Sequence, residues 1–191
     1  MRNSAKKLAS AILALAMTAA MSVTAYAADY GMAPVPTTTA SESTPATTEE
    51  LTSAVESAKG GAVANVQVAT TVGLTVKPTV LKELAQKADG VLEIVAPKAT
   101  ISIDASTITK ARNVNLSMKV TNTKSRTVIN MASKKDFGCE VKVTLTSCKL
   151  SAEKLENAHW YFNGKDMGPV ELDDDGNPVV TLTKGGKIEI K

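Results

Sequence analysis

The sequence predicts an all-β fold, an antiparallel β-sandwich of about eight or nine short strands with two or three short helices. Apolar and polar residues alternate with a period of two along most of the chain beyond residue 70, as in strands with one buried face. Helical spacing is confined to short segments. Because long helices do not alternate with the strands, a parallel α/β sheet is not expected.

The first 27 residues are expected to direct export and then to be removed. Arg2, Lys6 and Lys7 precede the apolar run LASAILALAMTAAMSV, and Ala25 and Ala27 supply the small residues that a signal peptidase recognises. The run is shorter than the about 20 residues of a membrane-spanning helix. We therefore expect a secreted or cell-surface-associated protein, with no membrane insertion after the signal is removed.

Removal of this segment also changes the charge balance. The chain has 22 Lys and Arg against 19 Asp and Glu, a formal net charge of +3, and Arg2, Lys6 and Lys7 account for the excess. The remaining chain is near neutral and has no broad electrostatic attraction for nucleic acid or anionic lipid. Nucleic acid is therefore not an expected partner.

Residues 28–61 predict a spacer that contains one short helix. The stretch GMAPVPTTTASESTPATT is rich in threonine and proline and has too little apolar surface to offset the entropy of ordering. Thr47 and Glu50 then fit a capping box, and Gly60 ends the helix. The apolar face of this helix is expected to hold Leu51, Ala54, Val55 and Ala58.

Residues 62–191 are expected to form one β-sandwich domain, because about 130 residues suffice for a single core. VLEIVA and ATISI predict two strands separated by Pro97. The other alternating apolar sets are Val72, Leu74 and Val76; Val114, Leu116, Met118 and Val120; Phe137, Cys139, Val141, Val143 and Leu145; Val170 and Leu172; Val180 and Leu182; and Ile188 and Ile190.

Two further short helices are predicted within this domain. TVLKELAQKADG ends at Gly90, and LSAEKLENA has Ser151 as its expected N-cap. The apolar stripe of the first of these helices is expected to hold Leu81, Leu84, Ala85 and Ala88.

VLKELAQKADGVLEIVAPKATISIDASTI, taken with DDDGNPVVTLTKGGKIEI, resembles β-rich modules of secreted cell-surface proteins of Gram-positive anaerobes. Such modules often accompany S-layer homology or dockerin segments. The resemblance covers roughly residues 72–191 and lies in the pattern, not in a signature motif. It implies a non-catalytic extracellular module and supplies no functional residues. No S-layer repeat, LPxTG-type sorting signal or dockerin is found in this chain.

LDDDGNP, which starts at Leu172, predicts a hairpin turn rather than a calcium site. An EF-hand loop that starts at Asp173 places Pro178 where glycine is needed and Lys184 where a glutamate should close the site. A loop that starts at Glu171 places glycine correctly but ends on Leu182. Asp-Gly between two alternating runs is a strong hairpin signal.

The two cysteines, Cys139 and Cys148, are expected to be unpaired. An extended strand would separate them by about 30 Å, whereas a disulfide needs Cα atoms within about 7 Å. Cys139 shares the parity of Val141 and Val143 and should point into the core.

Catalytic residues, metal ligands and cofactors are not expected. His159 is the only histidine, and HExxH, GxSxG and phosphate-loop motifs are absent from the sequence. The basic pairs Lys124 with Arg126 and Lys134 with Lys135 should flank the strand TVINMA. They are solvated loop charges or, alternatively, contacts to an anionic wall polymer.

The leading hypothesis is an exported, non-catalytic module that acts by contact with a cell-surface protein or a wall polymer, in a structural or adhesion role. In AHWYFNG, parity places Trp160 and Phe162 in the core and His159 and Tyr161 outside. His159 and Tyr161 are therefore the expected partner contacts, with Asn163 at the rim. A carbohydrate-binding module is the alternative, although few aromatic residues are free to stack on sugars. A hydrolase with an unrecognised site is the third hypothesis.

We predict that the mature protein begins at Ala28, because the basic, apolar and small-residue segments occur in the order of a signal peptide. N-terminal sequencing of the protein from the culture medium or cell surface tests this. Material that still begins at Met1 would refute the export assignment.

Overall fold

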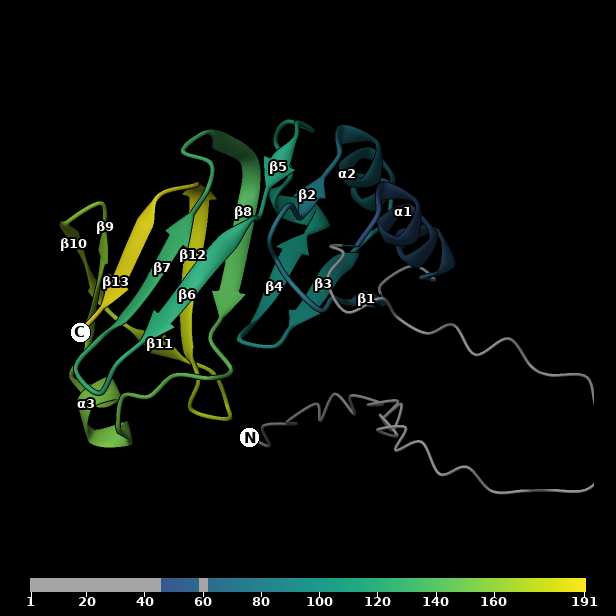
Figure 1. Cartoon of the computed structure of the whole chain (residues 1–191). Helices are drawn as coiled ribbons and strands as arrows, with labels where there is room; N and C mark the ends of the chain where they lie inside the picture. The colour runs from purple at the N-terminus through teal and green to yellow at the C-terminus, as the bar shows by residue number, and fades with distance from the viewer. Residues whose placement is uncertain (1–45, 59–61) are drawn as a thin grey trace, which may run out of the picture. The chain divides into compact units, whose positions relative to one another are not determined.

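The computed structural model describes residues 46–58 and 62–191, all within one compact unit. The predicted signal peptide and most of the predicted spacer lie outside the described residues. The described chain is mostly β, with 13 strands in three sheets and a few short helices (Figure 1). This is consistent with the expected all-β, sandwich-like fold, although the strands are more numerous than predicted because several contain only two residues.

Two sheets form the body of this unit. The six-stranded sheet has the order β1 (Val63–Gln67), β3 (Val91–Ala96), β4 (Ala99–Asp104), β8 (Asp136–Thr144), β12 (Pro178–Lys184) and β11 (Glu171–Leu172). The five-stranded sheet has the order β10 (Lys165–Pro169), β9 (His159–Phe162), β13 (Lys187–Ile190), β7 (Thr127–Met131) and β6 (Met118–Asn122).

The remaining elements are short. β2 (Thr75–Val76) and β5 (Val114–Asn115) form a two-stranded sheet. The helices are α1 (Thr48–Ser57), α2 (Pro78–Ala85) and α3 (Ala152–Glu156), with one 3₁₀ turn, η1 (Ala105–Thr107). Figure 1 shows α1 and α2 together beside β1 and β3, and α3 at the other end of the unit.

Side chains from both larger sheets fill one core. The alternation predicted for β8 is confirmed, since all five of its predicted apolar positions are buried. The same core receives Ile129 from β7, Val180 and Leu182 from β12, and Ile188 and Ile190 from β13. Each of these strands therefore turns one face inward and leaves the other for solvent.

One strand pair corrects the expectation of a wholly antiparallel fold, because β1 and β3 are parallel. Parallel neighbours need a long crossover connection, and α2 lies within the segment that joins them. Val80, Leu81 and Leu84 bury the inner face of α2. The helix ends at Ala85, earlier than predicted, and the expected stripe residues Ala85 and Ala88 are exposed.

Two alternating runs do not form the single strands that their pattern suggests. Val72 is 65% exposed, because Thr71–Leu74 is a turn in which Gly73 has a φ of 80°. VNLSMKV is divided between β5 and β6, so the chain changes sheets within it. Leu172 is also exposed rather than buried. Alternation reports burial of side chains and does not show where strand pairing stops.

Helix α1 packs with the folded unit. Its predicted capping box is present, with Thr47 Oγ1 accepting from Glu50 N at 3.2 Å and Glu50 Oε2 accepting from Thr47 N at 2.7 Å. Leu51 and Val55 are fully buried in the common core. Lys87 Nζ donates to the main-chain oxygen of Ala58 at 2.6 Å, at the C-terminal end of the helix. The sequence pattern grouped this helix with the spacer, whereas its buried face contacts the β-rich part.

The LDDDGNP segment is a hairpin turn between β11 and β12, as predicted. Gly176 has a φ of 78°, and its amide donates to Asp173 O at 3.0 Å. The Asp173 carboxylate accepts from the amides of Asp175 and Asn177 at 3.0 and 2.8 Å. At least one carboxylate of the acidic run is therefore engaged in closing the turn.

Gly185 and Gly186 connect β12 in one sheet with β13 in the other. A Cβ at Gly185 would collide with the carbonyl oxygen of Ser133, and one at Gly186 would lie 2.7 Å from the Phe162 ring. The Gly185 amide donates to Lys135 O at 3.1 Å. The two glycines thus allow a close approach of main chain between the sheets.

Cys139 and Cys148 are both free. Cys139 is 4% exposed on the inner face of β8. Cys148 is half-buried, with its Sγ 3.4 Å from Thr127 Oγ1. Burial and, secondarily, the nearby Asp136 charge raise the pKa of the Cys139 thiol to about 11.

We predict that Leu51→Ala destabilises the mature protein by about 2–5 kcal/mol, because it leaves a cavity in a packed core. Denaturant unfolding measures the loss. Ser53→Ala, an exposed position on the same helix, should change the free energy of unfolding by less than about 0.5 kcal/mol. Equal stability of the two variants would show that α1 does not contribute to the core.

We also predict that iodoacetamide labels Cys148 of the native protein at least about tenfold faster than Cys139 at about pH 8, because only the thiolate reacts. Mass spectrometry of digested, labelled protein distinguishes the two sites. In denaturant both should react at similar rates. Rapid native labelling of Cys139, or a disulfide between the two cysteines, would contradict the strand assignment.

Candidate functional site

The register between β9 and β13 decides which side chains of AHWYFNG face solvent. Ile188 pairs with Phe162 and Ile190 pairs with Trp160. Because directly opposed residues share a face and both isoleucines are buried, Trp160 and Phe162 lie on the core side. The predicted parity is present, but both aromatic rings are only half-buried against the core. The physical reason is that β9 lies one strand from the edge of its sheet.

Tyr161 occupies the outward face of the five-stranded sheet. It pairs with Asp166 of β10 on one side and with Glu189 of β13 on the other. Glu189 in turn pairs with Val128, and Val128 pairs with Thr121. These residues form one row across all five strands. We call this surface the outer face, defined by that row and by the flanking residues His159, Lys119, Arg126, Lys187 and Lys191.

Glu189 organises the cations of the outer face. Its two carboxylate oxygens lie 2.9 Å from Arg126 Nη1 and 3.7 Å from Lys187 Nζ. The Glu189 side chain is only 14% exposed. Partial burial raises the pKa of this carboxyl, but the Arg126 hydrogen bond and the charges of Lys187, Lys191 and Arg126 outweigh it, so the pKa is lowered overall. Glu189 is therefore anionic at neutral pH and holds two cations in place.

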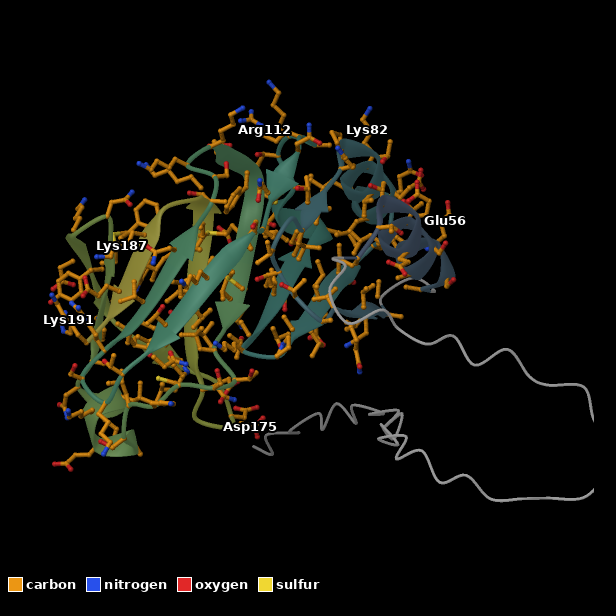
Figure 2. The ribbon with its side chains drawn as sticks, in the orientation of Figure 1. Glu56, Lys82, Arg112, Asp175, Lys187 and Lys191 are labelled. Carbon is orange, nitrogen blue, oxygen red and sulfur yellow. The ribbon has the colours of Figure 1, made fainter. Side chains whose placement is uncertain are left out.

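Lys191 lies over Tyr161. Its Nζ is 4.4 Å from the centroid of the Tyr161 ring, in the geometry of a cation–π contact. The main chain of Lys191 exchanges hydrogen bonds of 3.0 and 3.1 Å with His159. Tyr161 and His159 are consequently ordered by the same residue, which follows β13. Figure 2 shows Lys187 and Lys191 together beside β9, β10 and β13.

His159 contacts Asp166 across the β9–β10 hairpin. Its Nδ1 lies 3.1 and 3.0 Å from the two carboxylate oxygens of Asp166. The Gly168 amide donates to Asp166 Oδ1 at 2.8 Å. This bond, together with the His159 contact, lowers the pKa of Asp166. No hydroxyl or thiol within the described ranges is hydrogen-bonded to the His159 ring, so the pair does not extend to a nucleophile there.

Asn163, expected at the rim, has a structural part in the site. Asn163 and Gly164 have φ values of 50° and 86° in the turn between β9 and β10, as Asn-Gly hairpins require. Asn163 Oδ1 accepts from Lys187 N at 2.9 Å, and Asn163 N donates to Lys187 O at 2.8 Å. Asn163 therefore ties the hairpin to the start of β13.

The basic pairs predicted to flank one strand are separated by β7, as expected. Arg126 precedes β7 and Lys134 and Lys135 follow it. Only Arg126 belongs to the outer face. Lys134 and Lys135 line a hollow with Asn113 and Asn115 at the opposite end of the strand.

An apolar groove of about 420 Å³ lies elsewhere, between β6 and the β3–β4 turn. Its walls include Val72, Pro97, Met118 and Val120. Within residues 46–58 and 62–191, no three His, Cys, Asp or Glu side chains lie close enough together to hold a metal ion. Within the same ranges, no helix has the length and apolar character needed to cross a membrane.

Comparisons with known proteins return no match: no protein-family model fits this chain, and no curated protein or solved structure is similar to it. The resemblance to surface modules of Gram-positive anaerobes therefore stays a prediction from the sequence pattern.

The sequence pattern predicted that His159 and Tyr161 share one face, but it did not predict the charged residues that surround them there. Lys187, Glu189 and Lys191 alternate with two buried isoleucines, so their common face could have been read from KIEIK. Arg126 and Asp166 join the site only through strand pairing, which periodicity does not report.

Proposed function

We propose that this chain is an exported, non-catalytic β-sandwich module that binds a cell-surface protein or wall polymer through its outer face. The observation that carries the proposal is the composition of this face. Tyr161 and His159 lie there with four cations; these six residues belong to three strands, to the turn before β7 and to the residue after β13, and a shared core sets the register of the strands. Contacts within the face hold Tyr161, Arg126 and Lys187, so these side chains have less freedom left to lose on binding.

A sandwich architecture is supported by the burial pattern. β8 and β12 in one sheet, and β7 and β13 in the other, send their apolar side chains into the same core. Each sheet then presents one polar face. An accessible, polar face is suited to contact with a large partner, and less so to enclosing a small substrate.

A tyrosine on such a face is a favourable contact residue, because its ring offers area at low entropic cost and its hydroxyl can hydrogen-bond. Sugar stacking is less well supported, since the Lys191 ammonium already lies over the Tyr161 ring. Trp160 and Phe162, which could extend an aromatic platform, face the core side.

We predict that Tyr161→Ala abolishes binding to the producing cell's wall fraction while the melting temperature changes by only a few degrees. Co-sedimentation of the purified mature chain with that fraction measures binding, and circular dichroism measures melting. Trp160→Ala should instead lower the free energy of unfolding by at least about 2 kcal/mol, since it removes a large ring packed against the core.

Thr181→Ala is the matched control for Tyr161→Ala, because it is an exposed strand residue of the other sheet and should leave wall binding intact. A stable Trp160→Ala variant that loses binding, beside an unfolded Tyr161→Ala variant, would mean that β9 is displaced by one residue. Undiminished wall binding by Tyr161→Ala would refute the outer face as the contact.

A further inference from the structure

Charged side chains are divided unequally between the outward faces of the two sheets. The outer face carries Lys119, Arg126, Lys187 and Lys191 against Glu189 and Asp166. The outward face of the six-stranded sheet carries more acids than bases among its threonines and serines; its charged residues include Glu93, Asp104, Glu140 and Glu171 against Lys142. A chain that is near neutral as a whole therefore has one basic face and one acidic face.

The excess of basic residues on this face is also visible in the sequence. Residues 105–135 contain seven lysines and arginines and no aspartate or glutamate. This stretch includes β6, β7 and the turn between them, which supply Lys119 and Arg126. The five-stranded sheet is thus built partly from an acid-free segment, and its basic character does not depend on a single side chain.

Strand pairing places the four cations on either side of the row of residues that contains Tyr161 and Glu189. Lys119 and Lys187 both pair with Asn130, one on each side of β7. Ile190 of β13 pairs with Thr127 of β7. Continuing this antiparallel register by one residue places Lys191 opposite Arg126. Neighbouring strands are about 4.8 Å apart, and alternate residues on a strand are about 6.7 Å apart. The cations therefore stand at the corners of a patch roughly 10–13 Å across.

Two of these cations have no acidic partner. Arg126 and Lys187 share Glu189, whereas the ion pairs found among the described residues include neither Lys119 nor Lys191. Glu189 pairs with two cations at once, and Lys119 and Lys191 form no ion pair within the described part of the chain. The outer face therefore has an excess of positive charge that can bind an anionic ligand.

We propose that the outer face binds a linear polyanion, a polymer with repeated phosphate or carboxylate groups. The proposal rests on the proposed function and names the chemical class of its partner. Single exposed ion pairs contribute only about 0–1 kcal/mol, so isolated anions bind weakly here. A polymer contacts several cations at once and releases counterions from each, which makes the total affinity appreciable and salt-dependent.

The test measures binding of fluorescently labelled inorganic polyphosphate to the mature chain at several salt concentrations. Log Kd should rise linearly with log salt. Lys119→Gln with Lys191→Gln should weaken binding about tenfold or more and reduce the salt slope by roughly one to two. These two changes leave the Glu189 ion pairs with Arg126 and Lys187 intact.

Lys82→Gln with Lys142→Gln is the matched control, because it removes the same charge from α2 and from the six-stranded sheet and should change Kd by less than about twofold. Lys119→Arg with Lys191→Arg should retain binding. In a second arm, polygalacturonate replaces polyphosphate. The polymer with the lower Kd shows whether phosphate or carboxylate is the preferred group. Equal losses in the test and control pairs, or no loss in either, would overturn the proposal.

Single-stranded DNA is a third arm, and binding tighter than that of both other polymers would overturn the assignment in favour of nucleic acid. Wall binding is measured in parallel. If it depends on Tyr161 but not on salt or on Lys119 and Lys191, the proposed function stands and the polyanion proposal fails. If polyphosphate binds as expected while no outer-face variant affects wall binding, the proposed function fails instead.

Discussion

The crossing of the chain through Gly185 and Gly186 is the constraint on which the two sheets and the outer face depend. β12 ends in one sheet and β13 begins in the other with only these two glycines between them. The main chain passes so close to Ser133 and to the Phe162 ring that a side chain at either position would collide. Because the crossing is tight, it leaves little freedom for β13 to slide along its neighbours.

Because β13 begins directly after this crossing, the position of the crossing also fixes the position of the candidate site. It pairs with β7 on one side and β9 on the other, and Asn163 bonds to the main chain of Lys187 at its start. Its buried isoleucines and outward charges alternate strictly, so a slip of one residue would place Glu189 in the core and expose Ile188. The cost of burying that carboxylate holds the register, and the register positions Tyr161 and His159.

The polar contacts of the outer face then follow from neighbouring strands. Glu189 is shared by Arg126 and Lys187, and Lys191 covers Tyr161. Each contact is modest because the groups are partly exposed, so their effect is to orient side chains more than to stabilise the fold. The proposed contact with an extended charged partner depends on this organisation and on the cations that it leaves unpaired within the described ranges.

The sequence by itself determined the β-rich class, the buried face of β8, the turn at LDDDGNP, and the opposite orientation of Trp160 and Tyr161. All of these depend on neighbours in sequence, through periodicity and the positive φ that glycine and asparagine tolerate. Only the tertiary structure decided the parallel β1–β3 pair, the division of VNLSMKV between two sheets and the packing of α1. It also decided that Asp166 and Glu189 flank Tyr161 and that Arg126 pairs with Glu189. Pairing between distant strands depends on which hydrophobic faces can be buried together, and that is a property of the whole core rather than of any local pattern.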